Sequence, residues 1–121
     1  MRLLSIINEN TEIEIKSYLN WVAEKVRDQI ISQYGSLENT CDIGADMVKE
    51  ILSKESGFNA TVINGEYYFK NDDWHEGHRW LLVVNGDHIF IVDPTVEQFE
   101  DNVDMVISID DNDSGRYFVP N

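Results

Sequence analysis

The chain has 121 residues, enough for one domain with its own hydrophobic core and too few for a two-domain enzyme. Hydrophobic residues make up 42% of it, a content typical of a folded globule rather than of a disordered chain. Nine Lys and Arg against 23 Asp and Glu give a net charge of -14, which argues against direct nucleic-acid binding and against an anionic membrane, and leaves a basic or neutral protein partner.

The first part of the chain, residues 11–56, is predicted to be helical. Thr11 and Glu14 have the spacing of a capping box, and apolar residues then recur every three or four positions. Gly35 follows the last of these residues and supplies a stop, because glycine readily adopts the left-handed conformation that ends a helix. The pattern therefore predicts one amphipathic helix between Thr11 and Gly35.

A second helix is expected after this stop, with Asn39 or Thr40 as its N-cap and Gly57 just past its end. Cys41 then lies in its first turn. It is the only cysteine of the sequence, so no internal disulfide can form and nothing indicates an oxidising compartment. No signal sequence or membrane span is evident, so we expect a cytoplasmic protein, or one delivered into a target cell without an N-terminal signal.

Residues 58–119 are predicted to form an antiparallel sheet. Asn64-Gly65 and Asn85-Gly86 each lie between short β-rich runs, and this dipeptide is a strong hairpin signal. The expected strands cover residues 58–63, 67–69, 79–84, 88–92, 103–109 and 116–119, with a turn at 110–115. Helices followed by an antiparallel sheet predict a single α+β domain over residues 1–121, with the helices packed on one face.

The second hairpin is expected to bring a histidine and an aspartate together. With Asn85-Gly86 as a two-residue turn, His78 lies directly opposite Asp93, close enough for a hydrogen bond. A three-residue loop that includes Asp87 would instead put Pro94 opposite His78. The same side of the hairpin carries an apolar stripe formed by Trp80, Leu82, Ile89 and Ile91.

Three of these residues have the chemistry of a nucleophile, a base and an orienting group. A cysteine in the first turn of a helix is close to the positive end of the helix dipole and to free backbone N–H groups, which favour the thiolate and can hold an oxyanion. If this helix packs on the apolar face of the hairpin, Cys41 meets His78, with Asp93 behind the imidazole. Trp80 would then be a core residue or a wall of the site.

The same residues carry a resemblance to a known group of enzymes. The segments are Cys41-x-x-x-Ala45, Gly65-Glu66-Tyr67, Gly77-His78-Arg79-Trp80, and Ile91-Val92-Asp93-Pro94-Thr95 followed by Gln98-Phe99. In this order they resemble the core of the papain-like and transglutaminase-like cysteine enzymes, above all the small papain-fold deamidase and toxin domains. The resemblance implies a papain-like core with Cys41 as nucleophile, His78 as general base and acid, and Asp93 as the residue that orients His78.

Two features depart from that family. Asp42 follows the cysteine, and a carboxylate at this place opposes thiolate formation. No glutamine precedes Cys41 at the spacing that the papain type uses, so the oxyanion would be held by the backbone N–H of Cys41, with Asn39 as the nearest side-chain donor. Either departure is compatible with an inactive copy of the fold.

The sequence therefore predicts a thiol hydrolase that acts on an amide of a protein substrate. Glutamine deamidation is favoured over peptide cleavage or transglutaminase-like acyl transfer, because the resemblance is closest to compact deamidase-like domains. The alternative is a catalytically inactive acidic module that binds a basic partner or imitates nucleic acid, since residues 81–121 contain nine acidic residues and one basic residue.

The sequence contains one rival candidate, a metal site near the start of the second hairpin. The segment 72–78 contains His75, Glu76 and His78, but His-Glu-x-His is not the His-Glu-x-x-His spacing of a helical zinc protease. We expect residues 72–77 to form a loop that borders the site, and we expect neither a metal nor a cofactor.

Overall fold

The computed structural model describes residues 11–70 and 74–120, and the first of its helices begins where the capping box predicts. Helix α1 (Glu12–Tyr34) follows Thr11, whose hydroxyl accepts a hydrogen bond from the Glu14 backbone at 3.1 Å. The Glu14 carboxylate accepts one from the Thr11 backbone, also at 3.1 Å, which completes the box. The helix stops at Gly35, which has φ 82°. Both ends of the first predicted helix are thus confirmed.

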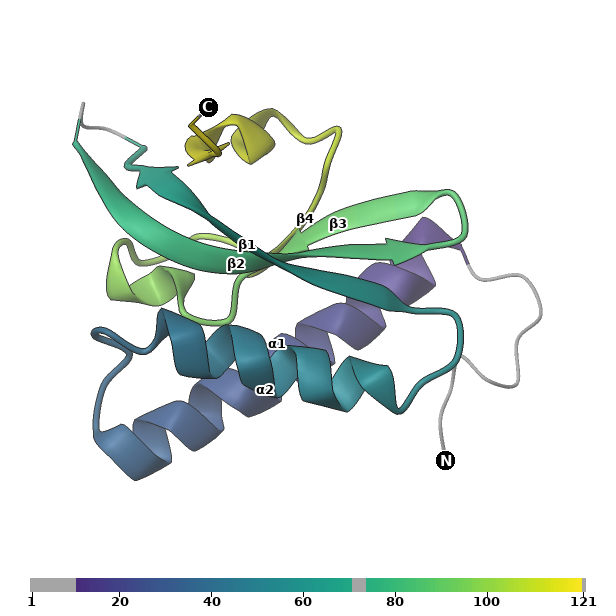
Figure 1. The fold of residues 1–121 in the computed structure, drawn as a ribbon, viewed down its shortest axis with the longest axis horizontal. Coiled ribbons are helices and arrows are strands. Elements are labelled where there is room, and N and C mark those ends of the chain that lie inside the picture. Colours follow the sequence, from purple (N-terminus) through teal and green to yellow (C-terminus); the bar gives the residue numbers. More distant parts are fainter. Residues whose placement is uncertain (1–10, 71–73, 121) are drawn as a thin grey trace.

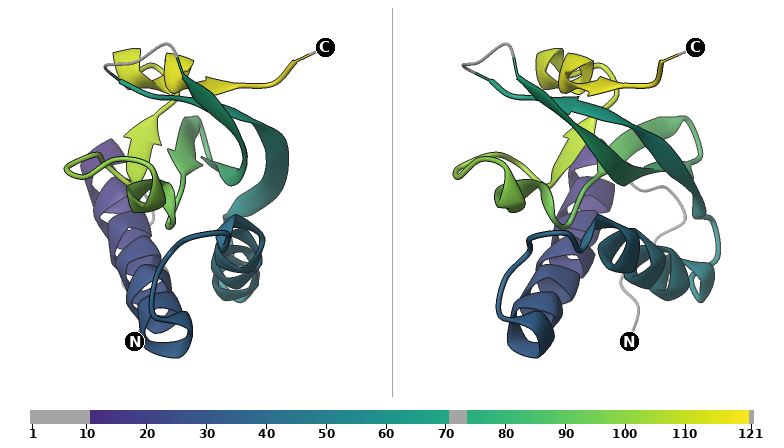
Figure 2. Two further views of the ribbon diagram at one scale, coloured as in Figure 1. Left: turned by 90° about the vertical axis from the view of Figure 1, so that its left-hand side faces the viewer. Right: turned by 60° about the vertical axis from the view of Figure 1, so that its left-hand side comes forward.

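The remaining elements complete an α+β fold, as expected (Figure 1). They are α2 (Cys41–Ser53), β1 (Asn59–Tyr68), β2 (His75–Asn85), β3 (His88–Val92), β4 (Val106–Ser108) and β5 (Tyr117–Phe118), with short 3-10 helices η2 (Val96–Gln98) and η3 (Asn112–Arg116). The strands form one antiparallel sheet in the order β4-β3-β2-β1-β5. Both α-helices lie on the same side of this sheet, and η3, which leads into the edge strand β5, lies on the other side (Figure 2).

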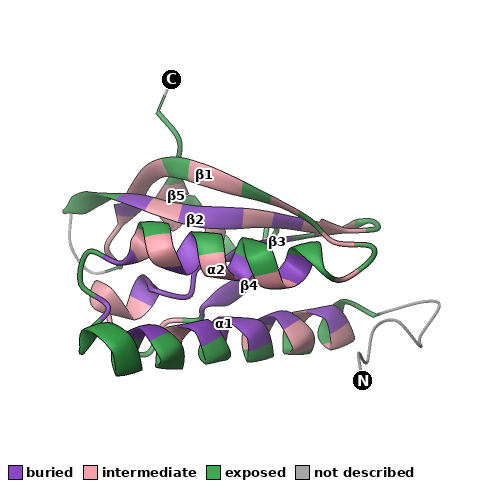
Figure 3. Cartoon of the chain, turned by 60° about the horizontal axis from the view of Figure 1, so that its bottom comes forward, coloured by how far each residue is buried: buried purple, intermediate pink, exposed green. Residues whose placement is uncertain are grey.

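The main core lies between the helices and one face of the sheet. On α1 the fully buried residues recur every three or four positions and form a stripe along the helix (Figure 3). The sheet contributes Leu81, Val83, Phe90 and Val92 to the same core. Each such side chain contributes roughly 1.5–3 kcal/mol by leaving water.

The apolar stripe that includes Trp80 lies on the other face of the sheet, which corrects the expectation that the second helix packs against it. Trp80 and Ile91 form a separate small cluster with Ile107, against which Tyr117 of the C-terminal segment packs. The helices cover the alternate set of side chains instead, because Val83 and its neighbours on that face complete a larger apolar core. Cys41 and His78 come together elsewhere, where the first turn of α2 lies beside β1 and β2.

The hairpin predicted at Asn64-Gly65 does not exist: β1 runs straight through both residues and pairs with β2 along its whole length. Gly65 serves close packing instead. A Cβ at this position would lie within 2.3 Å of the Phe118 carbonyl oxygen and 2.5 Å of the Trp80 ring. The glycine that indicated a turn is needed because β5 and an indole approach the strand there.

The second hairpin is present, but its turn lies one residue later than predicted. Asn85 pairs with His88, so the turn residues are Gly86 and Asp87. Gly86 has φ 59°, whereas Asp87 is not in the left-handed region, which is the pattern of a type II′ turn. Neither predicted register is correct, and His78 is not directly opposite Asp93.

Other boundaries also differ. Helix α2 ends at Ser53, before the predicted limit at residue 56. The strands expected at 103–109 and 116–119 are reduced to the short β4 and β5, and η3 occupies most of the predicted turn. Of the loop expected at 72–77, residues 75–77 belong to β2, while residues 72 and 73 lie outside the described part of the chain.

Candidate functional site

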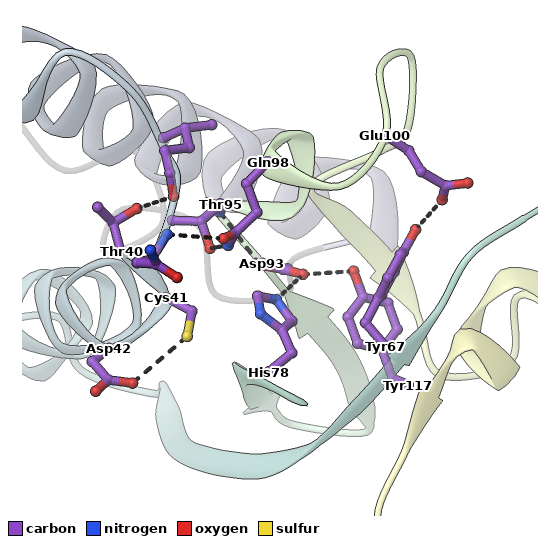
Figure 4. A network of polar contacts seen from close by, with 12 residues as sticks. Thr40, Cys41, Asp42, Tyr67, His78, Asp93, Thr95, Gln98, Glu100 and Tyr117 are labelled. Carbon is purple, nitrogen blue, oxygen red and sulfur yellow. Dashed lines mark hydrogen bonds and ion pairs between the residues drawn. The ribbon is translucent and has the colours of Figure 1, made fainter. Parts of the chain in front are cut away.

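Cys41 is the first residue of α2, and its side chain points toward His78 of β2 (Figure 4). Thr40, the residue before it, is the N-cap, but its hydroxyl donates to the Leu37 carbonyl at 2.5 Å instead of capping the helix. No described side chain caps this helix, so the backbone N–H groups of its first turn are left available at the cysteine. The thiol is partly exposed.

His78 and Asp93 form a buried pair. Nε2 of His78 lies 2.7 Å from Oδ2 of Asp93, and both side chains are fully buried. The two meet although the strands do not pair them, because β3 ends at Val92 and Asp93 is the next residue. An ionised carboxylate only accepts hydrogen bonds, so Nε2 carries the proton and Nδ1 is the second, chemically active nitrogen.

The free nitrogen of His78 faces the cysteine. Nδ1 is buried and has no hydrogen-bond partner in the described part of the chain. Figure 4 shows the Cys41 sulfur pointing toward this imidazole, on the side opposite Asp93. Burial lowers the pKa of His78, but the Asp93 carboxylate and the Cys41 thiol outweigh this effect and raise that pKa from 6.5 to about 9. The imidazole is therefore held mainly in its protonated form at neutral pH.

Asp93 is itself held by two further donors. The hydroxyl of Tyr117 donates to Oδ2 at 2.9 Å, and the backbone N–H of Thr95 donates to Oδ1 at 3.3 Å. Burial and the Asp93 carboxylate raise the pKa of Tyr117 well above 10, so its hydroxyl stays protonated and donates. The carboxylate is thereby fixed in the orientation that holds His78.

The carboxylate that follows the cysteine is not isolated. Oδ1 of Asp42 lies 3.6 Å from the Cys41 sulfur, and the same oxygen lies 3.2 Å from the Arg79 guanidinium. The Arg79 side chain also donates from Nε to the Asn64 side chain, which fixes the guanidinium beside Asp42. Arg79 thus neutralises the carboxylate beside the cysteine, in an ion pair whose groups are 37% and 64% exposed and which therefore contributes little to stability.

Trp80 and Asn39, the other two predicted site residues, lie on different sides of the triad. The Trp80 ring is buried and stacks beside His78, with centroids 6.1 Å apart, so it is both a core residue and a wall behind the imidazole. Asn39 has φ 59°, and its backbone N–H donates to Oε1 of Gln98 at 3.2 Å. No described interaction shows the Asn39 side chain acting as an oxyanion donor at the sulfur.

Gln98 and Tyr117 also support the site, although the sequence predicts no role for either. Gln98 accepts from Asn39 and donates to the Thr95 hydroxyl at 3.1 Å, so it ties the loop before the cysteine to the segment after Asp93. Tyr117 comes from β5, at the far end of the sequence. The motif contained Gln98 and so could have suggested it, but no local signal marks Tyr117, because its partner is distant in the sequence.

A shallow hollow connects the Cys41 sulfur with the protein surface. Its volume is about 280 Å³, and it lies between the first turn of α2 and the β1–β2 hairpin. Cys41 and His78 both line it, beside Gly65 and Gly77. A small planar group can therefore approach the sulfur and the imidazole from solvent.

Two other properties concern the described residues alone. Within residues 11–70 and 74–120, no group of three His, Cys, Asp or Glu side chains is arranged to hold a metal ion. In the same part of the chain, neither helix combines the length and apolar character needed to cross a membrane.

Comparison with protein-family models, with curated proteins and with solved structures found no match for this chain.

Proposed function

We propose that the protein is a papain-like thiol amidohydrolase, with glutamine deamidation of a protein substrate as its reaction. The observation that carries this proposal is the order of three groups: the Cys41 sulfur at a helix N-terminus, the unpartnered Nδ1 of His78 facing it, and Asp93 fixing Nε2 on the far side. Nucleophilic catalysis by a thiol uses this spatial order of nucleophile, base and orienting group.

In the first half of the reaction, the Cys41 thiolate attacks the carbon of a carboxamide and a C–S bond forms. The carbonyl oxygen becomes an oxyanion, and the backbone N–H groups at the start of α2 are placed to stabilise it. The His78 imidazolium then gives its Nδ1 proton to the departing nitrogen, the C–N bond breaks, and ammonia leaves. A thioester to Cys41 remains.

In the second half, neutral His78 takes a proton from water at Nδ1 while the water oxygen attacks the thioester carbon. The C–S bond breaks, the carboxylic acid leaves, and the thiolate and the imidazolium are restored. The sum is a carboxamide plus water giving an acid plus ammonia. Throughout, Asp93 keeps the imidazole in one orientation and stabilises its positive charge.

The shape of the opening favours a side-chain amide. The hollow over Cys41 is about 280 Å³ and shallow, so it suits one projecting carboxamide better than a long stretch of main chain lying across it. A peptidase or a transglutaminase-like enzyme would use the same triad, with a main-chain amide as substrate or with an amine in place of water. The triad alone does not distinguish these three reactions, so an experiment must do so.

The test is mass spectrometry of glutamine-containing peptides incubated with the wild-type protein and with Cys41→Ala. Deamidation adds about 1 Da per glutamine, because an amide NH₂ is replaced by OH, and releases ammonia. The expected result is this gain with the wild type and none with the variant, whose folding is checked by circular dichroism. Peptide cleavage would instead indicate a peptidase, and amine incorporation would indicate a transglutaminase-like enzyme.

A second measurement tests the thiol itself. Alkylation of Cys41 by iodoacetamide should remain fast at about pH 6–7, where an ordinary thiol with a pKa near 8.5 reacts slowly. The variant His78→Gln, which lacks the imidazolium, should lose this reactivity. A wild-type protein that is slow at these pH values and converts no peptide would contradict the enzyme proposal and favour the noncatalytic acidic module.

A further inference from the structure

A second, larger hollow lies near the hollow over Cys41. It has a volume of about 550 Å³, within the range of about 300–1,000 Å³ that is common for ligand sites. Its walls come from the end of α1, the loop that leads to Cys41, the start of β2 and the segment around η2. No step of the proposed reaction uses this cavity.

The cavity adjoins the candidate site, because residues in its walls neighbour Cys41 and His78. Asn39, which lines it, precedes Cys41 by two residues, and Glu76 lines it two residues before His78 in the same strand. The Phe99 ring, also in its wall, meets the His78 ring edge-on with centroids 4.8 Å apart. A substrate whose amide reaches Cys41 would therefore place a neighbouring residue at or in this cavity.

The walls combine negative charge with aromatic surface. Three glutamates line the cavity, and none of the described lining residues is basic. Glu97 is paired with Arg27 at 3.3 Å, and Glu76 accepts from the Trp74 indole at 3.0 Å. The Glu38 carboxylate has no ion-pair or hydrogen-bond partner among the residues that the structure describes.

Phe69 and Phe99 provide the aromatic part of the walls, and their rings pack together with centroids 5.5 Å apart. Aromatic faces bind the aliphatic stem of lysine or arginine, and they attract its cationic end. Carboxylates beside these rings satisfy the same cation by charge-assisted hydrogen bonds. The chain as a whole, with its net charge of -14, also favours a positively charged partner.

We infer that this cavity is a subsite for a lysine or arginine side chain of the substrate, close in sequence to the residue whose amide reaches Cys41. The inference rests on the proposed function for its role in catalysis, but binding of a basic peptide is measurable without any reaction. Glu38 and Glu76 would contact the cation, and Phe69 and Phe99 would contact its stem.

The experiment compares fluorescent glutamine peptides that differ only in arginine or citrulline at the flanking positions. Citrulline keeps the shape of arginine and lacks its charge. Dissociation constants are measured by fluorescence anisotropy with the Cys41→Ala variant of the whole 121-residue chain, which removes turnover. The arginine peptide should bind about tenfold more tightly than the citrulline peptide at low salt, and added salt should reduce this difference.

Three variants locate the interaction. Glu38→Gln and Glu76→Gln should each weaken binding of the arginine peptide by about two- to fivefold, as expected for a partly exposed ion pair, and should leave the citrulline peptide unaffected. Asp87→Asn is the matched control, because it removes one exposed carboxylate at the turn of the β2–β3 hairpin, nine residues along from His78. Circular dichroism of each variant checks its fold.

Equal binding of the two peptides would overturn the inference, and so would an equal loss in Asp87→Asn, which would indicate general attraction to an acidic surface. Failure of the proposed function is seen separately. If the arginine peptide binds in the cavity as described but the wild-type protein converts none of it, the subsite is supported and the thiol chemistry is refuted.

Discussion

The buried His78–Asp93 pair should make the stability of this protein fall as the pH rises above neutral. The pKa of His78 is raised from 6.5 to about 9, chiefly by Asp93 and Cys41 acting against the lowering effect of burial. A histidine with a raised pKa stabilises the folded state fully below its unfolded pKa, and this contribution is lost as the pH rises through the folded pKa. The window is therefore from pH 6.5 to about 9.

The size of the effect follows from the shift. Each pKa unit corresponds to 1.36 kcal/mol, so the difference between 6.5 and about 9 corresponds to on the order of 3 kcal/mol of unfolding free energy. Replacing Asp93 with Asn removes the carboxylate charge, so that burial, which lowers the pKa of His78, is opposed only by Cys41. The variant should lose this pH dependence and should unfold more easily at neutral pH, by about 3–5 kcal/mol, because a buried ion pair has been broken.

The assay is urea unfolding of the wild type and of Asp93→Asn at a series of pH values between about 6 and 10. His75→Gln is the control, because His75 pairs with Glu66 at 3.1 Å on the surface and should not affect the slope appreciably. The titration of the His78 ring, followed by NMR, gives the same pKa directly. A wild type whose stability is constant across this window, or a variant that keeps the same slope, would refute the reasoning.

Three further outcomes are expected. Gly65→Ala should destabilise the protein by about 1–3 kcal/mol, because the new Cβ would clash with β5 and an indole, whereas Gly77→Ala, where nothing lies within 4 Å, should be neutral or slightly stabilising. Equal thermal shifts for the two alanine variants would contradict this account of the hairpin. Tyr117→Phe removes the hydroxyl that donates to Asp93 and should lower stability by about 1.5–3 kcal/mol and change the pH profile of the reaction, a change that loss of packing alone would not produce. As a control, a stabilising substitution far from the site is added to Tyr117→Phe. If this double variant regains the wild-type pH profile, the hydroxyl has no positioning role. Thr11→Ala should cost about 0.5–2 kcal/mol in urea unfolding through loss of the capping box, and an unchanged midpoint would show that this helix end does not contribute to global stability.

The predictions that succeeded rest on signals close together in the sequence. The capping box at Thr11 and the stop at Gly35 lie within or beside the helix that they delimit, and both are found as expected. Thr40 was one of two candidates for the second N-cap, and this placed Cys41 at the start of α2. Both ends of α1 are set by hydrogen bonds between residues a few positions apart, so the sequence was sufficient to locate them, whereas α2 ends at Ser53, before the predicted limit at residue 56.

The predictions that failed concern features that are set by contacts between residues distant in the sequence. Gly65 has the sequence context of a turn, but its role is set by Phe118, which is far away in the chain. The turn at Gly86-Asp87 is a one-residue shift from the prediction, and the resulting register does not place His78 opposite Asp93. Strand register is set by side-chain packing over the whole sheet, so dipeptide signals do not determine it.

The sequence by itself determined the α+β class, both ends of α1, the start of α2 and the three residue types at the candidate site. Only the tertiary structure decided how they come together: Nδ1 of His78 faces Cys41, Arg79 pairs with Asp42, and Tyr117 holds Asp93. The physical reason is that helix caps are local, whereas the orientation of a buried histidine depends on every group packed around it. The net charge of -14 can likewise be read from the sequence. Only the fold gathers three glutamates, which are far apart in the chain, around one cavity beside the site.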